Sequence, residues 1–361
     1  MRSLQMCITD IANSKSIAIF CHTSPDADTL ASAVALKKLI KQNMSENSEP
    51  KQIDIFVDAD EINEINRAMI KGIEINVQNC DKYELGISVD CASSNRMGKY
   101  EQLYFDCENT INIDHHATNT YFAENNLVLK TSSTCEGLYI LAKSRNYKIS
   151  DEVCNLIYSG IITDTNNLTQ GVITINTHKI ITDLVARKIN IDALNDHFFK
   201  NNTKSKAYLL QKALSSLRFL SGDRIAFMKI TKQDMNDAEA TFDDTIGIVN
   251  HGIDLKGVEI AILAIKKEDN SYYVSLRGKN NVNVGVIAST FGGGGHDQVA
   301  AFQYNGLLTD LMPQLTKVCK EELSKHPVED IGENLFFGDE TDSTNSSSDS
   351  MEENVEENKK I

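Results

Sequence analysis

The chain has 361 residues, of which 41% are hydrophobic and 24% are charged, with four Pro and no Trp. This composition is ordinary for a soluble globular protein and excludes a wholly disordered or fibrous chain, and the length favours two domains over one. The formal net charge is −15, and residues 338–361 carry only six of these negative charges, so the rest of the chain is also acidic. That balance argues against a partner such as duplex DNA, which would need a basic surface.

The sequence shows no sign of a membrane or secretory destination. No apolar stretch approaches the roughly 18 residues that can span a bilayer. Asp10 and Asn13 precede a short apolar run, unlike the charged start and long apolar core of a signal peptide. The eight cysteines form no C-x-x-C pair and no even framework. We therefore predict reduced thiols, a cytoplasmic protein and no membrane partner.

Short apolar runs alternate with helical patterns through the first half of the chain. The runs are residues 16–21, 53–58, 85–90 and 110–114. Residues 29–43, between the first two runs, have the spacing of a helix with one apolar face. This alternation predicts a mostly parallel sheet with right-handed crossovers. Ligands bind beyond the carboxyl ends of the strands in such sheets, so the polar residues that follow the runs are candidates for a site.

Carboxylate and imidazole side chains follow these runs. The candidates are His22, Asp26, Asp28, Asp90, Asp114, His115, His116 and Asp164. Such groups are expensive to bury together unless a metal ion uses them. A set of imidazoles and carboxylates without Cys suits a divalent ion such as manganese better than a structural zinc. Asp58 and Asp60 form a similar pair without an imidazole nearby, and we interpret them as a strand end or helix cap.

A second pattern begins near residue 225. Three segments are predicted strands and two are predicted short helices: residues 224–230, 258–267 and 272–278, and residues 244–252 and 284–291. They indicate a second α/β domain with its own sheet. The preceding residues 198–222 contain five basic residues and no acidic one. This segment is interpreted as the solvated face of a connecting helix, with a phosphate-facing strip as the alternative.

The motifs together resemble a known family. The pattern H-x-x-x-D-x-D from His22, the strand-terminal Asp90, IDHH ending at His116, and GIITDT resemble the DHH phosphoesterases in content and order. The second half resembles their associated C-terminal domain through VSLRG (274–278) and FGGGGH (291–296). The resemblance covers about residues 10–325. It is greatest to the bacterial branch that contains nanoRNases and phosphatases of 3′-phosphoadenosine 5′-phosphate (pAp).

The resemblance implies an α/β fold with a mostly parallel-sheet DHH domain, a helical linker and a smaller α/β domain. The implied parts are a catalytic metal-binding domain over 1–190, a basic helical linker over 191–222, a substrate-binding domain over 223–330 and an acidic disordered tail over 331–361. A docking role for the tail is the alternative to a merely solvated one. A homodimer is expected only by analogy with the family.

The resemblance also implies two divalent metal ions as cofactors, most simply manganese. The ligands of one ion would be His22, Asp26 and Asp90, and those of the other would be Asp28, Asp90, His115 and Asp164. Asp90 would thus bridge the two ions, which would supply the nucleophile without a Ser or Cys.

Further residues receive roles from the same resemblance. Asp114 would sit behind His115 and fix its ring, and His116 would face the phosphate and the leaving group. The clamp on the nucleotide would consist of Arg277, Gly293, Gly294, Gly295 and His296. Two departures from the family pattern stand out. Ala27 replaces a usual Gly and should be tolerated, whereas Val299 and Ala301 replace small residues and leave the shape of the base pocket open.

The predicted function is a manganese-dependent phosphohydrolase acting on short single-stranded RNA or small adenine nucleotides. The substrates would be oligoribonucleotides of a few residues, pAp, or the dinucleotide pApA, and the sequence does not rank them. One alternative is a catalytically idle nucleotide-binding regulator, and another is an inorganic pyrophosphatase. The complete metal set argues against the first. FGGGGH, in place of a basic cluster, argues against the second.

Overall fold

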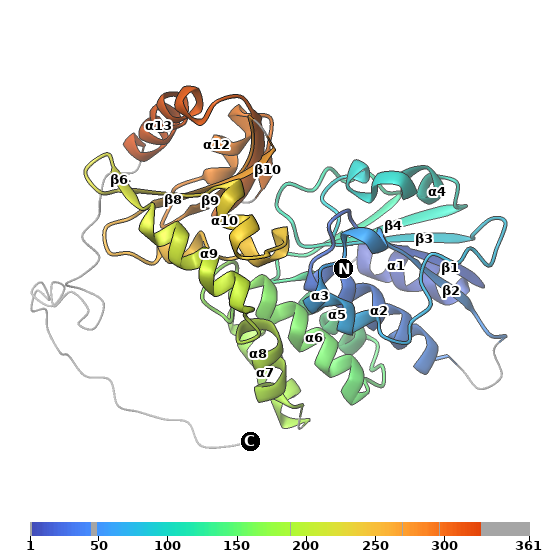
Figure 1. The fold of residues 1–361 in the computed structure, drawn as a ribbon. Coiled ribbons are helices and arrows are strands. Elements are labelled where there is room, and N and C mark those ends of the chain that lie inside the picture. Colours follow the sequence, from blue (N-terminus) through green and yellow to red (C-terminus); the bar gives the residue numbers. More distant parts are fainter. Residues whose placement is uncertain (1, 45–48, 188, 269, 296, 326–361) are drawn as a thin grey trace, which may run out of the picture. The chain divides into compact units, whose positions relative to one another are not determined.

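The structure is a computed structural model that describes residues 2–44, 49–187, 189–268, 270–295 and 297–325. The chain divides into two compact units, residues 1–202 and 203–361 (Figure 1). The segment expected to be a linker over 191–222 contributes one helix to each unit. The predicted tail over 331–361 lies outside the described residues.

The first unit contains one sheet with helices on its faces. Its strands are β1 (Ser16–Phe20), β2 (Gln52–Phe56), β3 (Leu85–Val89), β4 (Asn109–Asp114) and β5 (Asn125–Val128). Its α-helices are α1 (Arg2–Asn13), α2 (Ala27–Gln42), α3 (Glu64–Arg67), α4 (Glu101–Phe105), α5 (Thr134–Ser144), α6 (Asp151–Asp164), α7 (Ile175–Ala186) and α8 (Ile191–Phe199). Its 3₁₀ helices are η1 (Ala59–Glu61), η2 (Ala68–Ile70) and η3 (Ser94–Tyr100).

The strand order is β2-β1-β3-β4-β5, and every neighbouring pair is parallel. The predicted parallel sheet is therefore confirmed, and each of the four apolar runs is one of its strands. The chain moves from β1 to one side to form β2 and then to the other side to form β3. A crevice forms at such a switch point, beyond the carboxyl ends of the strands, and ligands bind there.

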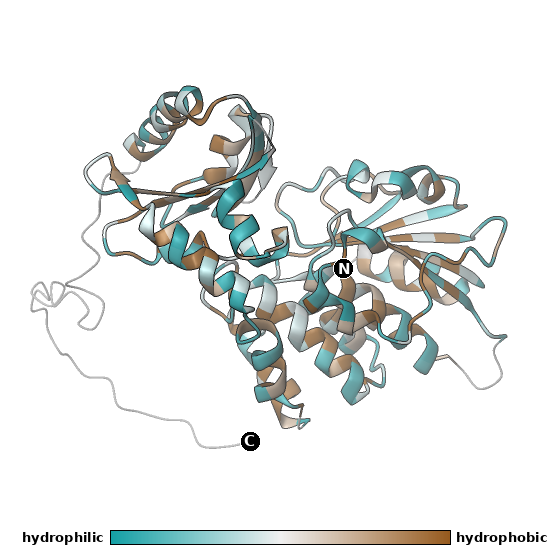
Figure 2. Cartoon of the chain, in the orientation of Figure 1, coloured by the Kyte–Doolittle hydropathy of each residue, from teal (hydrophilic) through white to brown (hydrophobic). Residues whose placement is uncertain are grey.

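Both faces of this sheet are buried, which explains the unbroken apolar runs. Ile17 and Ile19 of β1 pack in the large core that includes residues of α1, α2, α5 and α6. Ala18 and Phe20 point to the opposite face and pack in a smaller, aromatic-rich core around Tyr104. Figure 2 shows hydrophobic residues along the strands and on the helix faces that cover them.

The second unit is a mixed sheet covered by helices on both faces. Its strands are β6 (Arg218–Leu220), β7 (Ile225–Ile230), β8 (Ile260–Glu268), β9 (Ser271–Gly278), β10 (Gly294–Gly295) and β11 (Val299–Asn305). Its helices are α9 (Lys204–Ser215), α10 (Lys232–Asp237), η4 (Phe242–Thr245), α11 (Asn250–Ile253), α12 (Val284–Thr290) and α13 (Leu308–Ser324). The order is β10-β11-β9-β8-β7-β6, in which β7 and β8 are parallel and the other pairs are antiparallel.

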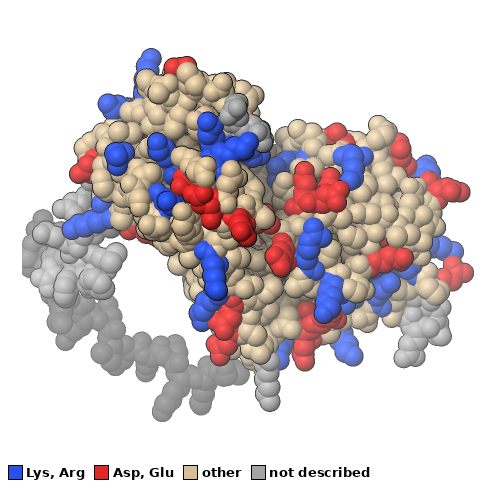
Figure 3. Space-filling view, viewed as in Figure 1, with Lys and Arg blue, Asp and Glu red and all other residues tan. Residues whose placement is uncertain are grey.

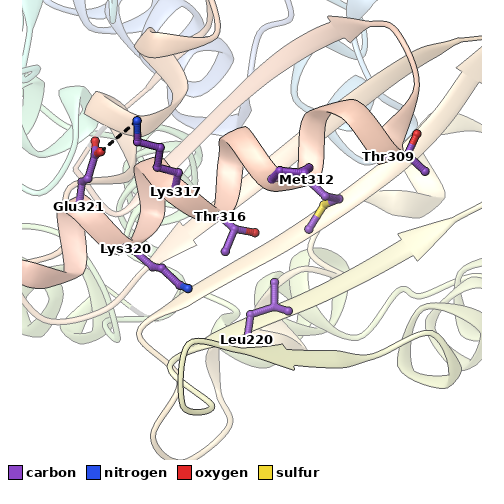
Figure 4. A pocket seen from close by; sticks show the side chains of 8 residues that line it. Leu220, Thr309, Met312, Thr316, Lys317, Lys320 and Glu321 are labelled. Atoms are coloured by element: carbon purple, nitrogen blue, oxygen red, sulfur yellow. Dashed lines mark ion pairs between the residues drawn. The ribbon is translucent and has the colours of Figure 1, made fainter.

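One hollow on the surface of the second unit lies apart from the predicted site residues. A hollow of about 610 Å³ lies between β6 and α13 (Figure 4). Its lining residues are Leu220, Thr309, Met312, Pro313, Thr316, Lys317, Lys320 and Glu321. Acidic and basic side chains are interspersed over the face that Figure 3 shows. In the described ranges of the chain, no helix is both long and apolar enough to span a membrane.

Gly160 allows α6 to pack closely inside the first unit. A Cβ at this position would overlap the Asp28 Oδ1 atom of α2 and the Cys135 Sγ atom of α5. Both neighbours are fully buried and have little room to move. The absence of a side chain at Gly160 therefore sets the distance between α6 and the two helices beside it.

We expect Gly160→Ala to lower the free energy of unfolding by about 1–3 kcal/mol, because overpacking forces the neighbours out of position. An alanine in an open helix site would instead stabilise it by up to about 1 kcal/mol. Urea unfolding followed by circular dichroism measures the difference. Gly137→Ala in α5 is the matched control, since its Cβ would meet mainly the mobile end of Leu129. A Gly160→Ala variant as stable as the wild type would contradict the packing argument.

Candidate active site

The predicted residues of the first unit meet at the carboxyl edge of its sheet. His22 follows β1, Asp26 is the N-cap of α2, and Asp28 lies in the first turn of that helix. Asp90 directly follows β3. Asp164 is the last residue of helix α6, so it reaches this edge from a helix end and not from a strand end. The switch point thus lies between the carboxyl ends of β1 and β3, which are followed by Asp26, Asp28 and Asp90.

The ligand atoms form overlapping groups. Among the described residues, three groups have ligand atoms within 4.8 Å of one another: Asp90, His115 and His116; His22, Asp26 and Asp90; and Asp28, His115 and Asp164. Asp90 belongs to two groups, and His115 joins the first to the third. This overlap is the pattern expected of two neighbouring ion sites that share a carboxylate.

Asp90 lies at the centre of the cluster. Its Oδ2 atom is 3.6 Å from His22 Nε2, and its Oδ1 atom is 3.5 Å from His115 Nε2 and 3.6 Å from His116 Nδ1. The residue has a left-handed backbone with φ of 59°, which is uncommon outside glycine. Such a conformation persists only where the surroundings hold it in place.

Two hydroxyls and two backbone amides hold the carboxylates. Thr29 Oγ1 donates to Asp90 Oδ2 at 2.7 Å and also lies 2.6 Å from His22 Nε2. Thr134 Oγ1 donates to Asp90 Oδ1 at 2.9 Å. The Asp28 carboxylate accepts the N–H groups of Thr134 at 2.7 Å and Cys135 at 3.1 Å. These N–H groups belong to the first turn of α5, where they have no partner within the helix.

The charges in the cluster are strongly coupled. Burial, together with the Asp90 carboxylate, raises the pKa of Asp28 to about 7. Burial, together with Asp28 and Asp90, also raises the pKa of Asp164. For Asp90 burial acts in the same direction, but His22, His116 and His115 outweigh it and lower the pKa of Asp90. Of these three carboxyl groups, Asp90 is therefore the one whose ionised form is favoured.

The rings of His22 and His115 are oriented as metal ligands usually are. His22 Nδ1 lies 2.6 Å from the carbonyl oxygen of Thr23, and His115 Nδ1 lies 3.4 Å from that of Thr131. A proton on each Nδ1 would leave each Nε2 atom, which faces the carboxylates, unprotonated, as a metal ligand must be. The residues therefore fit a divalent metal ion with oxygen and nitrogen ligands.

Asp114 has a different partner from the one that the resemblance implied. Its Oδ1 atom lies 2.6 Å from Nδ1 of His116, and not behind His115. Side chains alternate between the two faces of an extended strand, so Asp114 at the end of β4 shares its side with the residue two positions later. The carboxylate therefore fixes the ring of His116.

In the second unit the structure describes most of the predicted clamp. Arg277 lies on β9, where its Nε donates to Asn250 Oδ1 at 3.0 Å and its Nη1 to the Leu276 carbonyl at 2.9 Å. Gly293 contacts β11 so closely that a Cβ would overlap the Ala301 carbonyl oxygen. Gly294 and Gly295 form β10, which pairs with β11, and His296 lies outside the described residues.

Sequence reasoning missed three residues that hold this site: Thr29, Thr134 and Asn119. Thr29 directly follows the Asp28 motif and Asn119 follows His116 by three positions, so proximity to a motif was an available signal. Thr134 carried no comparable signal, because its hydroxyl reaches Asp90 from a helix 44 positions later in the chain.

Comparisons with known proteins agree with this geometry. The model "DHH family, N-terminal domain" matches residues 16–161, and the model "DHHA1 domain" matches residues 223–325. A probable bifunctional oligoribonuclease and PAP phosphatase of Streptococcus mutans is 27% identical over 301 residues, which are 82% of this chain and 92% of the relative. A bifunctional oligoribonuclease and PAP phosphatase of Mycoplasma genitalium is 27% identical over 311 residues, covering 82% and 91%.

A solved structure is similar over nearly the whole chain. It is an exopolyphosphatase-related protein of Bacteroides fragilis, with a TM-score of 0.74 and 20% sequence identity, covering 90% of this chain and 96% of that one. This similarity shows that the two proteins share a fold.

The cluster predicts that stability depends on pH and on metal. His22, His115, His116, Asp28 and Asp164 have a raised pKa, so the folded metal-free chain binds protons that the unfolded chain releases. Their contribution to stability is complete below the unfolded pKa and is lost as the pH rises through the folded pKa. We expect the melting temperature of the metal-free protein to fall between pH 6 and pH 8.

Bound Mn²⁺ should counteract this fall, because metal binding displaces the same protons and is favoured at higher pH. Thermal unfolding with EDTA and with Mn²⁺ at pH 6, 7 and 8 measures the shift, which should grow with pH. Asp60→Asn, which changes an exposed acid outside the cluster, should behave as the wild type. A metal-induced shift that stays constant over this range would contradict the assignment.

Proposed function

Because the chain belongs to the DHH family, we propose that it is a manganese-dependent phosphohydrolase of short oligoribonucleotides and of pAp. The observation that carries the proposal is the pair of ligand groups that share Asp90 at the switch point of the first sheet. The relatives named as oligoribonucleases and PAP phosphatases support the choice of substrates. The dinucleotide pApA has the same phosphodiester chemistry and is a further candidate.

The residues fit two divalent ions, which we assign as manganese. His22, Asp26 and Asp90 would hold one ion, and the second would be held by Asp28, Asp90, His115 and Asp164. When bound, such a pair activates water at neutral pH and neutralises negative charge on the phosphate. The mixture of imidazole and carboxylate ligands suits manganese better than magnesium, which prefers oxygen ligands alone.

Asp114 and His116, which are not among the proposed metal ligands, would act on the leaving group. Asp114 accepts a hydrogen bond from Nδ1 of His116, which fixes the ring and stabilises its protonated form. His116 would then donate a proton to the departing ribose oxygen as the phosphorus–oxygen bond breaks. General acid catalysis of this kind contributes about 10²–10⁴-fold.

The second unit would bind the nucleotide. Arg277 offers a guanidinium whose Nε donates to Asn250 and whose Nη1 donates to the Leu276 carbonyl, so Nη2 would face the phosphate. Gly293, Gly294 and Gly295 would allow a phosphate to approach the backbone N–H groups, with His296 beside them. Short substrates with an accessible end suit a site of this composition.

Asp90→Asn should reduce turnover by at least about 10³-fold, because the carboxylate is shared between both ion sites. The assay incubates the protein and Mn²⁺ with pAp, a short RNA, pApA and pyrophosphate in parallel, and identifies products by chromatography with mass detection. Mononucleotides or AMP should appear with the first three substrates.

Asp60→Asn is the matched control for the loss of one acidic charge, and it should retain wild-type turnover. Full activity of Asp90→Asn would refute the shared carboxylate. Cleavage of pyrophosphate alone by the wild type would refute the nucleotide substrates, and no cleavage despite bound metal would favour an idle binding protein.

Arg277→Ala should lower kcat/KM for nucleotides by about 10–100-fold, because a charge-assisted hydrogen bond contributes about 1.5–3 kcal/mol. Arg277→Lys should recover only part of this loss, since an ammonium lacks the planar fork of a guanidinium. Steady-state kinetics with pAp and pApA measure both effects. Arg218→Ala, on the exposed strand β6, is the control. Unchanged kinetics for Arg277→Ala would remove this residue from the substrate site.

A further inference from the structure

The turn after His116 returns a buried asparagine to the base of the candidate active site. The Asn119 N–H donates to the His116 carbonyl at 3.2 Å and closes this turn. The Asn119 Nδ2 atom lies 2.5 Å from Asp114 Oδ2, 2.7 Å from Asn112 Oδ1 and 3.2 Å from the Cys91 carbonyl oxygen. The side chain is only 8% exposed. One amide group therefore contacts three residues from two segments, the strand β4 and the loop after β3.

The hydrogen bonds determine which way this amide points. Asn119 Oδ1 accepts the N–H of Tyr121 at 2.7 Å, and this N–H can only donate. On the other side, the carboxylate of Asp114 and the carbonyl of Cys91 can only accept, so they require the NH₂ group. A flipped amide would lose all of these bonds. The side chain is therefore fixed at both ends.

Two partners of Asn119, Asp114 and Cys91, lie next to groups with a proposed catalytic role. One oxygen of Asp114 accepts from Asn119 and the other is bonded to His116 Nδ1, so Asn119 restricts rotation of the carboxylate that orients the imidazole. The Cys91 carbonyl, which also accepts from Asn112 Nδ2 at 3.1 Å, belongs to the residue that directly follows the left-handed Asp90.

We propose that Asn119 is a positioning residue for the hydrolysis, which aims His116 at the leaving group through Asp114. This inference rests on the proposed function. In the step concerned, water adds to phosphorus, the bond from phosphorus to the ribose oxygen breaks, and His116 Nε2 gives its proton to that oxygen. The Nδ1 proton stays between His116 and Asp114 throughout, which is the geometry that Asn119 maintains.

The choice of leaving group isolates this role. A ribose alkoxide needs a proton as it departs, whereas p-nitrophenolate departs without one. A residue that acts through His116 should therefore matter for pApA and not for the p-nitrophenyl ester of adenosine 5′-phosphate. A residue that only supports the fold would affect both substrates equally.

The experiment compares kcat and KM of Asn119→Ala on these two substrates. We expect kcat for pApA to fall by about 10–100-fold, which is part of a general acid contribution of about 10²–10⁴-fold. KM for pApA, kcat for the p-nitrophenyl ester and the affinity for Mn²⁺ in calorimetry should each change by less than about threefold. In a His116→Ala background, Asn119→Ala should cause no further loss.

Two further variants control for folding. Asn43→Ala removes an asparagine with a comparable set of hydrogen bonds, to Leu39 and Lys148, at the far end of α2, and it should retain wild-type kinetics on both substrates. Asn119→Ser keeps a small polar group and should show the same substrate-selective loss if Asn119→Ala does not fold.

Three results would overturn the inference alone: unchanged kinetics, equal losses on both substrates, or losses that multiply with those of His116→Ala. Failure of the wild type to cleave pApA, short RNA and pAp alike would overturn the proposed function, and this inference with it.

Discussion

Mutual repulsion among four carboxyl groups is the constraint on which the first unit depends. Asp26, Asp28, Asp90 and Asp164 approach one another at one edge of the sheet. Asp26 is exposed, but Asp28 and Asp90 are buried and Asp164 is half-buried, so these three cannot all remain ionised without compensation. Imidazoles surround the Asp90 carboxylate and lower its pKa, whereas the pKa values of Asp28 and Asp164 are raised. A pair of cations would neutralise the same groups. The crowding of these carboxyl groups therefore favours the binding of cations.

The packing of the helices follows from this arrangement. The first turn of α5 presents N–H groups to Asp28, and α6 approaches the same carboxylate through Gly160. Gly160 and Asp164 are four positions apart and therefore share a face of α6. The close approach at Gly160 thus directs Asp164 into the cluster. Gly160, which sets the packing of α6, and Asp164, which completes the site, therefore lie on the same face of this helix.

Much of the architecture could be predicted because both faces of the first sheet are buried, which makes each inner strand an apolar run. Strand β5, at the edge, contains Asn125 and Asn126 and buries mainly Leu127, so it has no such pattern. Strand periodicity could also have paired Asp114 with His116, because the two are separated by two positions. The amide network of Asn119 could not be inferred, since it depends on where a turn returns the chain. In the second unit, β10 is a pair of glycines that no propensity scale would assign to a strand.

The order of the site residues along the chain has a consequence for biosynthesis. The residues of the cluster extend along the chain from His22 to Asp164. The sheet aligns them only after the segments that connect its strands have formed. At about 5–20 residues per second, a ribosome needs roughly 7–28 s between these two positions. During that time the nascent chain exposes isolated acids with no complete coordination sphere. The group of Asp28, His115 and Asp164 is therefore complete only after α6 has emerged and docked, whereas the group of His22, Asp26 and Asp90 needs no residue of α6.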